Sequence, residues 1–171
     1  MTGIEELREQ YPDVPVTESF KELSPPAFQQ ALTRVEQESA ASVGSVVRDE
    51  ADRILLVSNA WSDGWIVPGG LAKPGESLTT AAQREVREET GVDATIERPV
   101  EFRRQRLQRA DSSDEVTMWF VGFLGRADEN APAVATDPGT NDEGIERVEW
   151  FETVPDGCAD ETLLELAGAL G

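Results

Sequence analysis

The chain has 171 residues, of which 34 are acidic and 15 basic, giving a formal net charge of −19 at pH 7. This length fits one domain with a buried core, and the charge argues against a partner such as duplex DNA or RNA, whose phosphates it would repel. Without histidine, and with the single cysteine Cys158, the chain cannot form Ser-His-Asp or Cys-His sites, an internal disulfide, or histidine-ligated or multi-cysteine metal sites.

Nothing in the sequence predicts contact with a membrane. There is no run of 18 apolar residues, and the acidic start MTGIEELREQYPD is unlike a signal peptide. We therefore expect a soluble, cytoplasmic protein.

The acidic residues are spread through the chain, and only Lys21 and Lys73 are lysines. This pattern is typical of proteins from salt-loving organisms, in which concentrated salt screens the repulsion between like charges. An ordinary acidic cytosolic protein is the alternative, but the scarcity of lysine favours a halophilic origin.

Residues 1–40 are predicted to form an N-terminal helical extension. The first 24 residues are expected to be weakly structured, although Ile4, Leu7 and Tyr11 could form one or two amphipathic turns before Pro12. Ser24-Pro25-Pro26 indicates the start of a helix. Apolar side chains then recur at helical spacing up to about Ala40, namely Phe28, Ala31, Leu32 and Val35. We expect this face to pack on the following domain, and a homodimer contact is the alternative.

Residues 41–171 are predicted to form the main domain. Strands are expected at 41–47 and 54–58, at 92–96 and 100–107 with a break near Pro99, and at 116–124 and 145–151. A long loop over 125–144 precedes the last strand, and a helix is expected near the C-terminal end, carrying Leu163, Leu166, Ala167 and Leu170. Strands on both sides of a central helix predict an α/β (α+β) sandwich around a mixed sheet.

The central stretch is Gly70 to Val92, GLAKPGESLTTAAQREVREETGV. Gly69 and Gly70 allow a sharp turn and a close approach of the backbone to a ligand. A helix should follow, capped at its start by Ser77, Thr79 or Thr80 and ended by Gly91.

Three glutamates of this helix, Glu85, Glu88 and Glu89, should share one face beside the apolar stripe of Leu78, Ala82 and Val86. Like charges on one face destabilise a helix, and a hard divalent cation such as Mg²⁺ or Mn²⁺ would compensate them. A solvated acidic face is the alternative. It suits Glu88, but it explains poorly why the other two glutamates adjoin the apolar stripe.

The stretch resembles the signature of the Nudix hydrolases. Its form is Gly70, five residues, Glu76, seven residues, Arg84-Glu85-Val86, one residue, Glu88-Glu89, one residue and Gly91-Val92, so that every fixed position of that signature is filled. The resemblance implies an α/β/α sandwich with a central mixed sheet. It also implies metal-dependent hydrolysis of a diphosphate bond in a nucleotide-type substrate such as an NDP-sugar, ADP-ribose or a (d)NTP.

The resemblance also implies roles for single residues. Glu85, Glu88, Glu89 and the backbone carbonyl of Gly69 would hold Mg²⁺ or Mn²⁺, and Arg84 would act with Glu85 and Glu89 in catalysis, chiefly by orienting the carboxylates together with Glu76.

Many members of the family also use an acidic residue on a loop before the last strand. Glu143 is the candidate here, with Asp142 as its neighbour and Gly144 allowing the loop to bend. The general base is therefore predicted to be either Glu85 or Glu143. The alternative is that Glu143 is only a solvated loop carboxylate.

Contacts to a nucleobase are less defined. Trp65, Phe102 and Trp119 could stack on a base, although core packing suits Trp119 better. Arg103, Arg104 and Arg106 could meet phosphates, but balancing surface acid is the favoured role. The residues that mark ADP-ribose pyrophosphatases, dinucleoside polyphosphate hydrolases and coenzyme A pyrophosphatases do not stand in the expected places.

Two other functions compete with hydrolysis: a non-catalytic nucleotide-binding Nudix module, such as a sensor, and an acidic metal-buffering or adaptor domain. The complete set of glutamates favours an enzyme.

Overall fold

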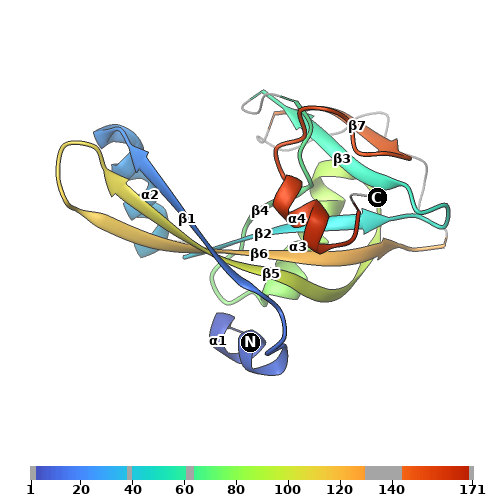
Figure 1. Ribbon diagram of the computed structural model, residues 1–171, viewed down its shortest axis with the longest axis horizontal. Coiled ribbons are helices and arrows are strands. Elements are labelled where there is room, and N and C mark those ends of the chain that lie inside the picture. The colour runs from blue at the N-terminus through green and yellow to red at the C-terminus, as the bar shows by residue number, and fades with distance from the viewer. Residues whose placement is uncertain (1–2, 38–39, 61–63, 130–143, 170–171) are drawn as a thin grey trace.

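A computed structural model describes residues 3–37, 40–60, 64–129 and 144–169 (Figure 1). The helices are α1 (Ile4–Gln10), α2 (Pro25–Gln37), α3 (Leu78–Thr90) and α4 (Glu161–Leu166). The strands are β1 (Val16–Leu23), β2 (Ala41–Arg48), β3 (Ile54–Asn59), β4 (Gly69–Leu71), β5 (Ala94–Arg109), β6 (Glu115–Ala127) and β7 (Ile145–Phe151). None of the helices in these ranges is long and apolar enough to cross a membrane.

The strands form one mixed sheet in the order β1-β5-β6-β2-β3-β7, with β4 paired to β2. β1 runs parallel to β5 and β2 parallel to β6, whereas the other pairs are antiparallel. This arrangement confirms the predicted mixed sheet.

Helices cover both faces of the sheet (Figure 1). On one face, α3 places Leu78, Ala81 and Ala82 against Val43 and Phe123. On the other face, Leu163 and Leu164 of α4 pack in a second cluster, which includes Val46, Leu56 and Val100. The expected α/β/α sandwich is therefore present, and burial of these apolar side chains is its main source of stability.

The N-terminal segment differs from the prediction. The amphipathic turns expected before Pro12 are present as α1, but the expectation that residues 1–24 are otherwise weakly structured is wrong, because they contain the strand β1. Thr17 of β1 donates a hydrogen bond of 2.6 Å to Glu101 of β5, a fully buried carboxylate that also pairs with Arg103. Val16 and Phe20 remain exposed, so the sequence of β1 does not show the alternation of apolar and polar residues that marks a half-buried strand. Its pairing with β5 defines it as a strand. The division of the chain at residue 40 stays a proposal.

The helix α2 packs on the far ends of β5 and β6, as its apolar spacing predicted. Phe28 and Ala31 form a small buried cluster with Val116, and Leu32 and Leu107 pack around it. Together with β1, these elements make an arm that extends from the body of the molecule (Figure 1). Formation of a homodimer through this arm stays a prediction.

The two strands predicted around Pro99 are one long strand, β5. The predicted break appears instead as register shifts against β6, between Ile96 and Arg98 and between Pro99 and Glu101. Proline has no N–H to donate to a neighbouring strand, so an irregularity at this point lets the strand continue.

Candidate active site

The helix α3 begins and ends as its sequence indicates. Ser77 is its N-cap and accepts a hydrogen bond of 3.1 Å from the Thr80 N–H, and Gly91 ends it with a left-handed φ of 74°. Leu78 and Val86 of the predicted apolar stripe are buried. These local signals determine which residues of the helix face the sheet.

The glycine strand β4 lies against β2, with Gly69 opposite Gly44 and Gly70 opposite Val43. A Cβ on Gly69 would lie 2.1 Å from the Val43 carbonyl oxygen, and one on Gly70 would lie 2.6 Å from Cδ of Glu85. A side chain at position 69 would therefore clash with the backbone of β2, whereas a side chain at position 70 would clash with the carboxylate of Glu85.

The residues just before β4 are held from two sides. The Pro68 carbonyl accepts a hydrogen bond of 3.0 Å from the Ser45 N–H, and the Val67 N–H donates one of 2.9 Å to Asp160 at the start of α4. Burial raises the pKa of Asp160 above its usual value. These bonds fix where the glycine strand meets α3.

Arg84 is the centre of the site. Its guanidinium donates to both oxygens of Glu76 at 2.8 and 3.0 Å, to Glu85 at 2.6 Å, to Glu88 at 3.0 Å and to the Leu71 carbonyl at 3.0 Å. The bidentate pair with Arg84 holds the pKa of Glu76 below its usual value, and it also raises the pKa of Arg84. One arginine thus joins the turn before α3, the strand β4 and two glutamates of α3, Glu85 and Glu88.

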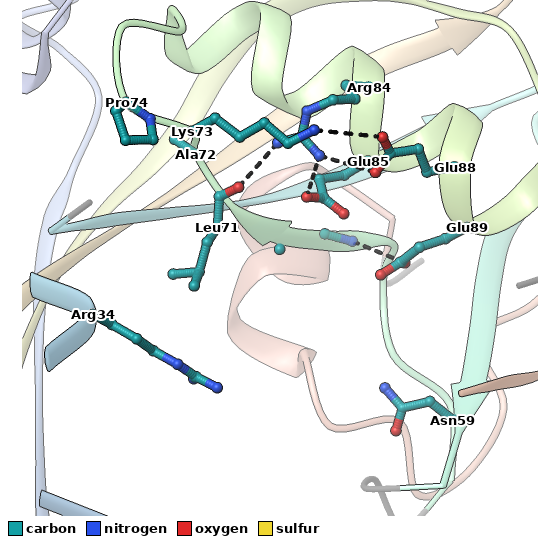
Figure 2. Close-up of a pocket in the computed structure, with 12 residues that line it drawn as sticks. Arg34, Asn59, Leu71, Ala72, Lys73, Pro74, Arg84, Glu85, Glu88 and Glu89 are labelled. Atoms are coloured by element: carbon teal, nitrogen blue, oxygen red, sulfur yellow. Dashed lines mark hydrogen bonds and ion pairs between the residues drawn. The ribbon is translucent and has the colours of Figure 1, made fainter. Parts of the chain in front are cut away.

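The three glutamates of α3, Glu85, Glu88 and Glu89, are called the box glutamates below, and they differ in burial. Glu85 is 2% and Glu89 4% exposed, whereas the side chain of Glu88 is 39% exposed. Glu89 accepts a hydrogen bond of 3.2 Å from the Gly69 N–H, and Figure 2 shows Glu85 and Glu89 turned toward β4. Burying two carboxylates beside an apolar stripe is costly without compensating partners, so the solvated-face alternative is wrong for Glu85 and Glu89.

A cleft of about 750 Å³ opens between α3, β4 and α2. Five of the predicted site residues line it, namely Gly69, Arg84, Glu85, Glu88 and Glu89, whereas Glu76 does not. Glu143 and Asp142 lie outside the described residues. The size of the cleft suits a nucleotide-sized ligand.

Sequence reasoning missed the two residues of this cleft that lie far from the signature stretch in the chain, Arg34 of α2 and Asn59 of β3. Arg34 lies on the polar side of the predicted helix, and the apolar pattern alone does not show which part of the molecule that polar side faces. Asn59 ends a strand, and only the sheet places it near α3.

The donor atoms of the site fit a hard divalent cation by type, since they are carboxylate and carbonyl oxygens. Among the described residues, no three carboxylates are already arranged as the ligands of a metal ion. Arg84 holds one oxygen of Glu85 and one of Glu88, and Glu89 bonds to the strand. A carboxylate can accept at both of its oxygens, so these contacts are compatible with binding a cation as well.

The aromatic candidates for base stacking are mostly part of the core. Phe102 is buried, and Trp65 is buried edge-on against Phe151, with ring centroids 4.8 Å apart. Trp119 is half-buried and lies beneath Arg8 of α1. The stacking role is therefore wrong for Trp65 and Phe102.

The three arginines after Phe102 balance surface or buried acid, as favoured, and none lines the cleft. Arg103 pairs with Glu101, Arg104 with Glu18 and Arg106 with Glu115.

We predict that Glu76→Gln lowers the melting temperature at pH 7 by about 2–4 °C, which corresponds to the loss of roughly 1 kcal/mol. Because the folded-state pKa of Glu76 is depressed, its ion pair stabilises the fold above the usual value of 4.5 and is lost as pH falls through the folded-state value. Thermal melts of both proteins from pH 7 to pH 3 should show the difference closing in that range. A difference that persists unchanged at pH 3 contradicts the prediction.

The chain is similar in sequence to proteins of known families. Residues 38–153 match the NUDIX domain family. The chain is 36% identical over 80 residues to a Bacillus subtilis protein provisionally named an 8-oxo-dGTP diphosphatase, covering 47% of this chain and 51% of that protein. It is 27% identical over 130 residues to the 8-oxo-dGDP phosphatase NUDT18 of Danio rerio, covering 74% of this chain and 37% of that protein.

The chain thus spans about half of the length of the first relative and just over a third of the second. Among solved structures, a UDP-X diphosphatase is similar in fold, with a TM-score of 0.51 and 19% identity over 84% of this chain and 69% of that chain.

Proposed function

Because the chain belongs to the Nudix domain family, we propose that it is a metal-dependent pyrophosphatase that hydrolyses a phosphoanhydride bond in a nucleotide-type substrate. The observation that carries this proposal is the meeting of Glu85, Glu88, Glu89, Arg84 and the glycine strand in one cleft. The names of the two relatives described above support the substrate class, since 8-oxo-dGTP and 8-oxo-dGDP both contain a nucleoside with linked phosphates.

In this proposal, Glu85, Glu88, Glu89 and the Gly69 carbonyl hold Mg²⁺ or Mn²⁺. Such an ion, when bound, neutralises charge on phosphate oxygens and lowers the pKa of a bound water.

The chain's own residues prepare the site for this chemistry. Arg84 holds Glu85 in place, and Gly69 holds Glu89, so the two buried carboxylates have defined positions before substrate arrives. Because these carboxylates are buried, they lie where the effective dielectric is lower than in water, and their interaction with a charged ligand in the cleft is therefore stronger. A general base, either Glu85 or Glu143, would take the proton of the attacking water.

A substrate panel tests the function. Purified protein is incubated with NDP-sugars, ADP-ribose, (d)NTPs and dinucleotides, with Mg²⁺, with Mn²⁺ and with excess chelator, in low and in molar salt. Hydrolysis that requires the metal supports the proposal. Tight binding without hydrolysis of any compound would instead indicate the non-catalytic nucleotide-binding module, and neither binding nor hydrolysis would leave the metal-buffering or adaptor function.

Glu143 has indirect support as a catalytic residue. Its described neighbour Gly144 has a left-handed φ of 64°, and its carbonyl accepts a hydrogen bond of 3.2 Å from Ala60, next to the cleft residue Asn59. We predict that Glu143→Gln lowers kcat by about 10²-fold, at the lower end of the range for general acid–base groups, while metal affinity changes less. The matched variant is Asp142→Asn. A loss only in Asp142→Asn assigns the role to Asp142, and no loss in either variant leaves Glu85 as the base.

We also propose that the protein is adapted to concentrated salt, because its charge of −19 is spread along the chain with only two lysines. The melting temperature should rise steadily from low to molar KCl, as the screening length falls from about 10 Å at 0.1 M to about 3 Å at 1 M. Sucrose at equal osmolality is the control, since it does not screen charge. A melting temperature that is flat in KCl, or that rises equally in sucrose, contradicts salt adaptation.

A further inference from the structure

Arg34 enters the cleft from outside the signature box. It lies in the last turn of α2, before residue 38, where the match to the family begins. Its helix is fixed on the sheet by Phe28 and Ala31, which pack against Val116 of β6. The position of Arg34 is therefore set by the arm of the molecule rather than by α3.

The Arg34 side chain lines the cleft from the side of α2. It lines the same cleft as Glu85, Glu88 and Glu89, and Figure 2 shows it extending from α2 on the side opposite to α3. The cleft thus has the box glutamates, with their partners Arg84 and Lys73, on the side of α3, and the exposed guanidinium of Arg34 on the side of α2.

Arg34 also differs from most arginines of this chain, because it has no carboxylate partner among the described residues. Nine arginines form ion pairs there: Arg8, Arg53, Arg84, Arg87, Arg103, Arg104, Arg106, Arg109 and Arg126. In a protein with 34 acidic residues, an unpaired arginine in a cleft is a candidate for binding an anion.

We propose that Arg34 binds a phosphate group of the substrate, on the wall of the cleft opposite to the box glutamates. This inference rests on the proposed function for its substrate class, a nucleotide with linked phosphates. A guanidinium offers a planar fork of N–H donors that matches phosphate oxygens. The negative charge of a phosphate group would also balance the positive charge of Arg34, which no carboxylate of the described residues balances. Substrate recognition then involves the N-terminal arm as well as the Nudix domain.

A competing role for Arg34 is general screening of the glutamates. The two roles differ in what the loss of the side chain changes. If Arg34 only screens, Arg34→Ala strengthens Mg²⁺ binding and leaves phosphate binding unaltered. If Arg34 binds phosphate, its loss weakens the binding of a phosphate ligand.

The test is calorimetric titration with methylenediphosphonate, a diphosphate analogue with a non-hydrolysable bridge, in the presence of Mg²⁺, and titration with Mg²⁺ alone. The variants are Arg34→Ala, Arg34→Lys and the control Arg98→Ala. Arg98 is also exposed and has no ion pair among the described residues, but it does not line the cleft. The two alanine variants therefore remove the same charge from the surface.

We expect Arg34→Ala to bind the analogue about 10- to 100-fold more weakly, as for the loss of a charge-assisted hydrogen bond, and Arg34→Lys to recover part of this loss. Arg98→Ala should bind like the wild type, and all variants should keep its melting temperature.

Equal affinity of Arg34→Ala and wild type, equal weakening in Arg98→Ala, or a wild-type protein that does not bind the analogue would each overturn the assignment. Because binding is measured without turnover, a failure of the hydrolysis panel alone would reject the proposed function and leave this result standing.

Discussion

Replacing Glu89 by glutamine is expected to lower kcat by about 10³-fold or more at saturating Mg²⁺, because metal-assisted charge stabilisation is worth several kcal/mol. The substitution is close to isosteric. Glutamine retains an oxygen that can accept the hydrogen bond from the Gly69 N–H, which is 3.2 Å in length, while it removes the buried negative charge. The fold should therefore survive, and lower repulsion between Glu85 and residue 89 should leave the metal-free protein at least as stable.

The measurement is kcat on the best substrate of the panel, together with Mg²⁺ affinity by calorimetry and the melting temperature without metal. Glu146→Gln is the matched control, since it removes one exposed carboxylate of β7 that does not line the cleft. Near-normal turnover of Glu89→Gln would remove Glu89 from the proposed metal ligands. A similar loss in Glu146→Gln would show that overall charge, rather than this position, controls the rate.

Gly70→Ala is the second substitution with a large expected effect. The new Cβ would lie 2.6 Å from Cδ of Glu85, a distance that real Cβ atoms do not tolerate. Glu85 has little room to withdraw, because it is buried and bonded to Arg84 at 2.6 Å. Displacement of a catalytic group by about 1 Å can cost about 10²-fold in rate, so we expect kcat to fall by at least that factor. Overpacking should also cost about 1–3 kcal/mol of stability.

Gly75→Ala separates these two effects. Gly75 has a left-handed φ of 80°, but no atom lies within 4 Å of the position that a Cβ would take, so alanine there strains the backbone without touching Glu85. It should lower the melting temperature and leave kcat nearly unchanged. If the two alanine variants lose stability and rate in the same proportion, crowding of Glu85 is not the cause of the lost activity.

The sequence predicted the central helix closely because its signals are local. The cap at Ser77, the stop at Gly91 and the apolar stripe all act within one or two turns of the chain. The same spacing predicted that Glu85 and Glu89 adjoin the core.

The strand β1 and the surroundings of the aromatic residues could not be predicted in this way. β1 has exposed Val16 and Phe20, and it is a strand because β5, more than 80 positions later, offers a parallel edge and the buried Glu101. Likewise, Phe102 is an aromatic residue among arginines in the sequence, and only the packing of α1 and α3 on the sheet buries it.

By itself, then, the sequence determined the box helix, its caps and its carboxylate face, since these depend on backbone propensity and on spacing of three or four residues. The order of strands and helices along the chain also predicted the mixed sandwich. Tertiary structure alone decided the close approach of Gly70 to Glu85, the five-acceptor network of Arg84 and the entry of Arg34 into the cleft. These features join residues from separate helices and strands. Their positions depend on the register of the sheet and on which faces pack together, and a local pattern contains no information on either.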